Sequence, residues 1–508
     1  MKRFLSLRFF AKLVAGLVVL CVIGVGVENW TGARALAEAR EDFMAKGGVL
    51  EFAAMQAKPL PTETNFLAIE QLDGISVPRE EEELPIHRKL LALDWAYAAI
   101  DKNPKAPRPN LNGGSATSVP LDVQGTAAYL SETSYIDTAP DADAAQVLAA
   151  IDRLHPLLKE LSDAAVDRRE ACFDHSASLG YVRAPYKLAT LHLNGALRAA
   201  KGLELRAQMA AAAGDAESAV RSVQASMRFT QALCQEPLLI GLLSGTATAD
   251  FDVNSLWYLL SQHTASAEQL ARLQADLERL DLMRAQFQAM RGELVWQMES
   301  IEWYKGHRDD FLKVFSEMQF IKEQTEPAWH VSAALHMIPS GWFDHNGATA
   351  LRLGSVYLIE PAMSRDGRGM MRAFDEIYDL LKKNHGMASP HHAWSVLGFS
   401  SFRMIIQQAI YCEALRRQCL AAIAIERYRL MHGKLPVALS NVVPEFLAKV
   451  PQDIMDDAPM RYRAEGDGKF ALWSIGWDGK DDGGIRPEGK EAKRANKANY
   501  VGDWVWKN

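Results

Sequence analysis

The chain has 508 residues, of which 48% are hydrophobic and 23% charged, a balance typical of folded globular proteins. This length suffices for at least two hydrophobic cores, because single domains usually contain about 100–200 residues. The formal net charge of −7 and the pI near 6.0 exclude the strongly basic class of nucleic-acid-binding proteins. We therefore expect no nucleic-acid partner.

The first 30 residues have the pattern of a membrane anchor. Four basic residues precede an uninterrupted apolar run from Leu13 to Val27, which ends at Glu28 and Asn29. With the two phenylalanines before it, the run approaches the ~20 residues that a membrane-spanning helix needs. Basic residues before the run and acidic residues after it place the N-terminus in the cytoplasm. Residues 1–30 thus predict a single-pass inner-membrane protein with a periplasmic body.

A cleaved signal peptide is the alternative, since it also combines a basic start with a short apolar core. The nearest small-x-small cleavage site, Gly24-Val-Gly26, matches poorly. Lipoprotein processing would require a small residue before Cys21, where the chain has Leu20. We favour the uncleaved anchor. Cleavage would instead give a secreted or periplasmic protein, and both alternatives imply export.

After the anchor, composition divides the chain into three parts. Residues 31–142 are rich in Pro and Gly and predict long loops with short helices, residues 143–400 predict a helical body, and residues 401–508 predict a long helix followed by a small C-terminal module. The expected fold is mainly α, a helical bundle or helical-hairpin body, with a small α+β module of short antiparallel strands. Helices are expected over residues 86–100, 188–213, 216–235, 266–303, 348–360, 372–384 and 401–432, and a surface loop over 103–120.

Cysteine usage leaves two interpretations open. Cys412 and Cys419 would lie two turns apart on one helix, roughly 10 Å by helix rise, which is too far for a disulfide. Cys172 and Cys234 are therefore the first candidates for a bridge. The alternative is that all four are buried free thiols, because cysteine behaves as a small core residue.

The C-terminal module resembles the head of the major pseudopilin of type II secretion. A long helix leads into Pro459-Met-Arg-Tyr462, then Ser474-Ile-Gly-Trp-Asp-Gly479, a glycine pair at Gly483-Gly484, and a closing Asp503-Trp504. The resemblance implies a small antiparallel sheet carried by the helix and a calcium ion that fixes the C-terminal loop. The sequence departs from the family at Asp453-Ile-Met-Asp456, where a Pro-Trp-Gly turn is missing.

The position of the anchor also departs from a pilin, because it lies some four hundred residues before the module and has no processing site. We interpret the module as a pilin-like head within a different protein. The whole chain is similar to uncharacterised membrane-anchored envelope proteins of planctomycetes and verrucomicrobia. The matching segments are residues 59–66, the Ala-rich helix ending at Asp215, residues 235–240 and the C-terminal module. This resemblance implies no known activity.

Four aspartates form the candidate metal site. Asp478, Asp481, Asp482 and Asp503, with carbonyls of the Gly-rich loop, offer the oxygen ligands that calcium prefers. The spacing is not that of an EF-hand, since Lys480 and Gly489 stand at the third and twelfth loop positions. The alternative interpretation is that Asp-Gly and Gly-Gly form solvated turns between short strands.

Other candidate sites have weaker signals. His391 and His392 are adjacent and would point apart. Cys172-Phe-Asp-His175 would place a thiol, a carboxylate and an imidazole within one helical turn, as a metal or nucleophile site or, in the interpretation we favour, as a structural cysteine with incidental polar neighbours. Zinc-protease, paired Cys-x-x-Cys, nucleophile-elbow, phosphate-loop and dinucleotide motifs are absent. No catalytic residue is assigned.

These observations predict an envelope interaction or scaffold protein with an envelope protein partner and a calcium-stabilised head, rather than an enzyme. One alternative is an envelope hydrolase acting on glycans or peptides, which should bring carboxylates or histidines with perturbed pKa values together. Another is an accessory component of a secretion or pilus-like machine, which would need a head that is free of the helical body. The sequence indicates neither the ligand nor the oligomeric state.

Overall fold

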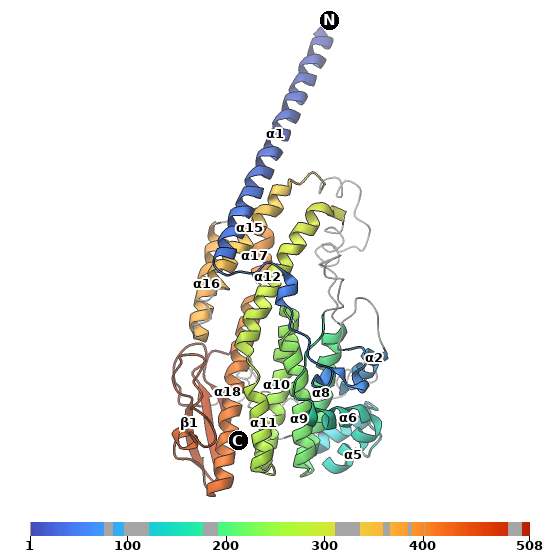
Figure 1. The fold of residues 1–508 in the computed structure, drawn as a ribbon, viewed down its shortest axis with the longest axis vertical. Coiled ribbons are helices and arrows are strands. Elements are labelled where there is room, and N and C mark those ends of the chain that lie inside the picture. Colours follow the sequence, from blue (N-terminus) through green and yellow to red (C-terminus); the bar gives the residue numbers. More distant parts are fainter. Residues whose placement is uncertain are drawn as a thin grey trace.

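The computed structural model describes residues 2–75, 85–95, 121–175, 191–309, 336–358, 366–384, 389–400, 402–485 and 500–507. A long N-terminal helix projects from an elongated helical body, and a small sheet lies beside the far end of that body (Figure 1). The fold is mainly helical with one three-stranded antiparallel sheet, as predicted. The expected loop over residues 103–120 lies outside the described residues.

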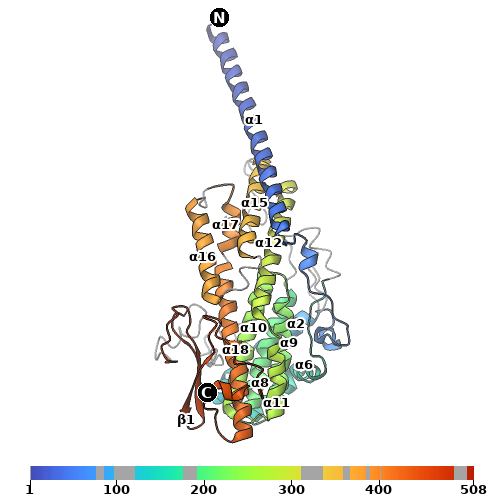
Figure 2. The same ribbon diagram turned by 60° about the vertical axis from the view of Figure 1, so that its left-hand side comes forward.

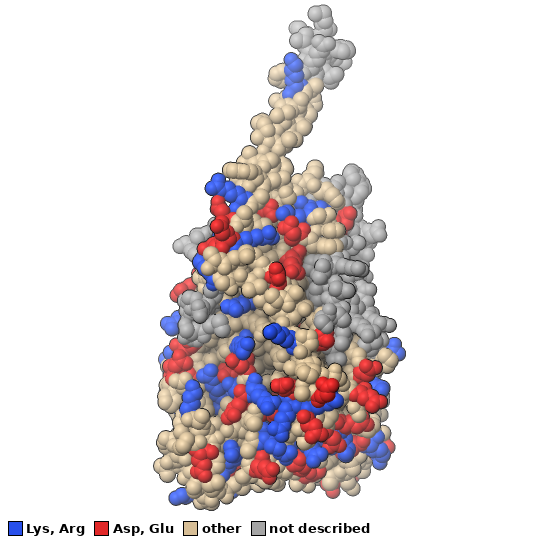
Figure 3. Space-filling model, viewed as in Figure 1, with Lys and Arg blue, Asp and Glu red and all other residues tan. Residues whose placement is uncertain are grey.

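The N-terminal helix is longer than the sequence predicted. Helix α1 runs without a break over Lys2–Ala45, because the residues after Glu28 are rich in alanine and other good helix formers. Its apolar part is long enough to cross a membrane and is not buried in the protein. Figure 3 shows this projecting part nearly free of charged residues, whereas acidic and basic residues are interspersed over the body.

Beyond the apolar part, α1 packs against helix α15, which spans Ser340–Tyr357. Two glycines allow the helices to come close. A Cβ atom on Gly32 would lie 2.5 Å from the carbonyl oxygen of Gly341, and one on Gly341 would lie 2.2 Å from the carbonyl oxygen of Glu28. The Asn29 side chain accepts a hydrogen bond from the Gly341 amide at 2.9 Å. The helix that leaves the apolar segment is therefore joined directly to the body.

Most of the body is built from long helices that lie side by side (Figure 2). Helices α8 and α9 form the predicted antiparallel pair, with Gly214 in a left-handed conformation (φ +79°) between them. The Asp215 side chain caps α9 by accepting from the Ser218 amide at 3.0 Å. Apart from α15, the α-helices that the described residues form between α1 and the sheet are α2 (Pro85–Leu91), α4 (Val123–Glu132), α5 (Ala144–Leu154), α6 (Pro156–Asp167), α8 (Leu191–Ala212), α9 (Ala216–Cys234), α10 (Leu239–Gln262), α11 (Ala267–Glu278), α12 (Leu282–Gly306), α16 (Gly367–Asn384), α17 (Ala393–Ser400) and α18 (Phe402–His432).

Several predicted helix boundaries need correction. The capping box at Ser266 is present, but the helix expected to reach Trp303 is two helices, α11 and α12. The second begins because the Asp281 side chain accepts from the Arg284 amide at 2.9 Å and caps a new helix. Helix α2 ends at Leu91, earlier than predicted, and α15 begins earlier than the helix predicted over 348–360.

The sheet follows α18 in sequence and packs against it. Strands β1 (Arg461–Gly466), β2 (Lys469–Ser474) and β3 (Trp504–Lys507) are antiparallel in the order β1-β2-β3. The Gln418 side chain of α18 donates to the Trp504 carbonyl at 2.7 Å, and the Trp257 indole of α10 donates to the Lys507 carbonyl at 2.6 Å. Phe470, Leu472, Trp504 and Trp506 belong to the same hydrophobic core as the helices. The sheet is thus an integral part of the body.

All five cysteines are free. Cys172, Cys234, Cys412 and Cys419 are buried, which agrees with the interpretation as core thiols and not with a Cys172–Cys234 bridge. Burial raises the pKa of Cys234 to about 12, so this thiol stays protonated at neutral pH.

Candidate functional site

The predicted calcium ligands lie in the loop that follows β2 and at the start of β3. Asp478, Asp481 and Asp482 are exposed, whereas Asp503 is 3% exposed. The Asp478 side chain accepts from the Lys480 amide at 3.1 Å, which is a turn contact. The four carboxylates do not form either of the two groups described below, in which three ligand atoms lie within 4.8 Å of one another.

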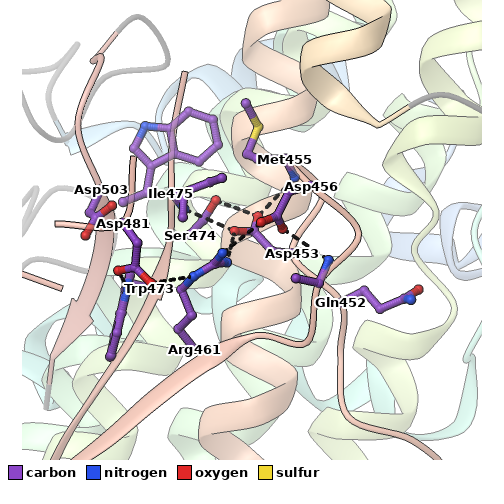
Figure 4. A network of polar contacts seen from close by, with 12 residues as sticks. Gln452, Asp453, Met455, Asp456, Arg461, Trp473, Ser474, Ile475, Asp481 and Asp503 are labelled. Carbon is purple, nitrogen blue, oxygen red and sulfur yellow. Dashed lines mark hydrogen bonds and ion pairs between the residues drawn. The ribbon is translucent and has the colours of Figure 1, made fainter. Parts of the chain in front are cut away.

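An arginine occupies the centre of the acidic residues nearby (Figure 4). The Arg461 guanidinium pairs with Asp453, Asp456 and Asp481 at 2.9, 2.7 and 3.0 Å. Asp453 has no exposed surface and also accepts from the Ser474 hydroxyl at 2.6 Å and the Ile475 amide at 3.0 Å. One predicted ligand, Asp481, is therefore paired with a cation from the chain itself. The network joins the loop before β1 to the strands.

Asp503 lies in a different environment. Its Oδ2 atom accepts from the Gly484 amide at 2.9 Å, while its Oδ1 atom is buried without a hydrogen-bond partner in the described part of the chain. Burial raises the pKa of Asp503 to about 6, and the negative charges of Asp481 and Asp482 act in the same direction. Among the four predicted ligands, Asp503 is the one whose buried carboxylate would be stabilised by a bound cation or by a proton.

A cluster that the sequence did not predict lies inside the body, where His175, His192 and Glu236 meet. His175 Nε2 lies 2.6 Å from Glu236 Oε1, and His192 Nε2 lies 3.4 Å from Glu236 Oε2. The three side chains are 3%, 2% and 5% exposed. Burial alone would raise the pKa of Glu236, but the hydrogen bonds and charges of the two histidines lower it to about 2.

Three separate segments carry this cluster. His175 lies in a non-helical segment that Asn65 holds: the Asn65 side chain donates to the Cys172 carbonyl at 2.9 Å and accepts from the Cys172 amide at 3.2 Å. His192 is the second residue of α8, and Glu236 lies between α9 and α10. The cluster joins residues up to 61 positions apart, so no local sequence motif contains all three.

The segment containing Cys172 and His175 is not helical, so the predicted arrangement within one helical turn is wrong. Burial raises the pKa of Cys172 to about 12, and the charges of Glu236 and Asp174 add to this effect. A thiol with this pKa is not a nucleophile at neutral pH. The Cys172 thiol donates to the Phe173 carbonyl, with 3.1 Å between Sγ and the oxygen. Cys172 is thus structural, as the sequence analysis favoured, whereas His175 belongs to the cluster.

A second group, Glu28, His345 and His391, lies where α1 leaves its apolar part. Glu28 Oε1 is 2.7 Å from His391 Nε2 and 3.6 Å from His345 Nε2. These side chains are 20–35% exposed. Burial lowers the pKa of His345, and the charge of His391 lowers it further. The contacts join α1 to α15 and to the residues before α17.

A comparison of this chain with protein-family models, with curated proteins and with solved structures finds no match. Its function is therefore inferred from the residues that the fold itself brings together.

Proposed function

We propose that the protein is a single-pass, membrane-anchored scaffold of the cell envelope, with a cytoplasmic N-terminus and a body that binds an envelope protein on the outer side. The observation that carries this proposal is α1. Its apolar part is exposed on all sides, and its remainder continues into the body as the same helix. An exposed apolar helix of this length is stable in a bilayer and not in water.

The junction between anchor and body supports a scaffold because it is close-packed. A continuous helix held by the Gly32–Gly341 contact and by the Glu28–His391 pair leaves no hinge between the membrane and the body. Such a junction fixes the orientation of the body at the membrane surface, which an anchor on a loose linker would not do. This anchoring predicts that the chain stays in the membrane fraction and that protease reaches its body only from the outer side.

We further propose that residues 401–508 are a pilin-like module. A long helix, α18, followed by a small antiparallel sheet that packs on it, supports this assignment. The sheet also contacts α10 and shares the core of the helical body. A head that is packed in this way favours a scaffold over a component of a pilus-like machine, which would need its head free.

The hydrolase alternative is favoured by one observation, the convergence of His175, His192 and Glu236. Each side chain is at most 5% exposed. Burial of this degree suits a small bound ion better than a glycan or peptide chain, which needs an open cleft. The scaffold therefore remains the better-supported function.

The calcium-stabilised head has a specific test at Asp503. In 1 mM calcium we expect the full-length chain in detergent to gain about 1.4 kcal/mol of unfolding free energy, if the Kd is ~10⁻⁴ M as in extracellular calcium modules. Asp503→Asn should abolish this gain because it removes the negative charge of a buried carboxylate whose Oδ1 atom has no hydrogen-bond partner among the described residues. The measurement is thermal unfolding with calcium and with chelator.

Asp467→Asn is the matched control, since it removes the same charge from an exposed turn between β1 and β2. It should leave the calcium response unchanged. A wild-type chain whose melting temperature is the same with calcium and with chelator would contradict the proposed calcium site.

A further inference from the structure

The buried cluster of His175, His192 and Glu236 has a charge imbalance that the helical scaffold does not explain. In the described part of the chain, the ion-pair partners of Glu236 are these two histidines. A carboxylate that is 5% exposed needs a nearby positive charge, because an unpaired buried charge is very costly. Within the described residues, that charge can come from a proton on an imidazole or from a metal ion bound between the three side chains.

The geometry is that of a metal site. Each histidine directs Nε2 at the carboxylate, and one ligand atom from each of the three side chains lies within 4.8 Å of the others. Zinc binds histidine nitrogen and carboxylate oxygen at about 2.0–2.2 Å, so tetrahedral ligand atoms lie about 3.3 Å apart. The observed separations of 2.6 and 3.4 Å require only small side-chain movements to accept an ion.

The surrounding structure holds the ligands in place. A Cβ atom on Gly241 of α10 would lie 2.2 Å from the Glu236 Cβ, and one on Gly292 of α12 would lie 1.7 Å from the Pro237 carbonyl oxygen. Two glycines thus make room for the connection that carries Glu236. The Phe173 ring packs edge-on against His192, with centroids 4.7 Å apart. Preorganised ligands of this kind distinguish a binding site from an incidental contact.

We infer that His175, His192 and Glu236 bind one divalent transition-metal ion, with zinc as the best-suited ion. Two imidazole nitrogens and one carboxylate favour zinc or iron over calcium and magnesium, which prefer oxygen ligands. Three protein ligands leave one position of a tetrahedral ion for water. This site is separate from the predicted calcium ligands and is independent of the scaffold proposal.

The test is metal binding by the full-length, tag-free chain in detergent after treatment with chelator. Titration with Zn²⁺ should show one tight equivalent per chain, and Co²⁺ should give the visible absorption bands of a four-coordinate nitrogen and oxygen site. His192→Ala and Glu236→Gln should each weaken zinc binding at least ~100-fold, more than the loss of an outer-shell contact.

Two further variants make the result decisive. His391→Ala, in the group near the membrane, should bind zinc as the wild type does. Gly241→Ala should weaken binding about tenfold, because the added methyl group displaces Glu236 while every ligand is kept. Circular dichroism checks that each variant is folded, and Glu236→Gln, which preserves side-chain size, carries the test if His192→Ala unfolds. The inference is overturned if the wild type binds no zinc, if Glu236→Gln binds equally well, or if His391→Ala is the variant that loses the ion.

Discussion

Asp276→Ala is expected to lower the unfolding free energy by ~3–5 kcal/mol, because it leaves a buried arginine without its counter-charge. Asp276 of α11 accepts from Arg228 of α9 at 2.7 Å and from the Gln224 side chain at 2.6 Å. The Arg228 and Asp276 side chains are 2% and 4% exposed. Burial lowers the pKa of Arg228, and Asp276 opposes that shift. Urea unfolding of the full-length chain in detergent, followed by circular dichroism, measures the loss.

Two companion variants separate charge from packing. The double substitution Arg228→Met with Asp276→Leu should recover most of the loss, since replacing both partners of a buried pair leaves no unpaired charge. Glu268→Ala, on an exposed turn of the same helix, should cost less than ~1 kcal/mol. If Asp276→Ala costs no more than Glu268→Ala, the pair does not hold α9 and α11 together.

Gly32→Leu is expected to separate residues 29–45 of α1 from α15. It should lower the unfolding free energy by about 3 kcal/mol, the upper end of the usual range for overpacking. We expect a cost at the upper end because the obstructing atom is the Gly341 backbone oxygen, 2.5 Å from the new Cβ position. A backbone oxygen cannot rotate away as a side chain can. Amide hydrogen exchange should therefore accelerate in residues 29–45 and in α15. The same measurement on the wild type provides the reference.

Gly26→Leu is the matched control, because it makes the same substitution on the same helix at a position with nothing within 4 Å. Both variants raise helix propensity equally, so a difference between them reports packing alone. If the amides of α15 exchange as slowly in Gly32→Leu as in Gly26→Leu, the Gly32–Gly341 contact does not hold α1 against the body.

The parts of the fold that could be predicted are those with strong local signals. The α8–α9 pair followed from Gly214 and Asp215, which stop one helix and cap the next. The helix over residues 402–432 followed from its length and amphipathic pattern. The break between α11 and α12 also had a local signal, Asp281 before an apolar residue. It was overlooked because the helical spacing of apolar residues is present both before and after Asp281.

The cluster at Glu236 could not be predicted, because its three members come from three segments that only the packing of the chain brings together. The sequence drew attention to His175, in Cys172-Phe-Asp-His175, but gave no sign that His192 and Glu236 would meet it. The extension of α1 to Ala45 was missed for a related reason. Its helix propensity was visible, but the apolar run ended at Val27, and only packing against α15 shows that the helix continues as part of the body.

Protease digestion of intact spheroplasts is the most direct test of membrane anchoring, with the full-length chain compared against a variant that lacks residues 2–27. We expect the full-length chain to stay in the membrane pellet after an alkaline carbonate wash, and external protease to remove its body while the N-terminal helix is protected. The variant should remain soluble inside the cell and escape digestion. A body recovered in the soluble periplasm without its first residues, or protected from external protease while in the membrane, would contradict the single-pass anchor.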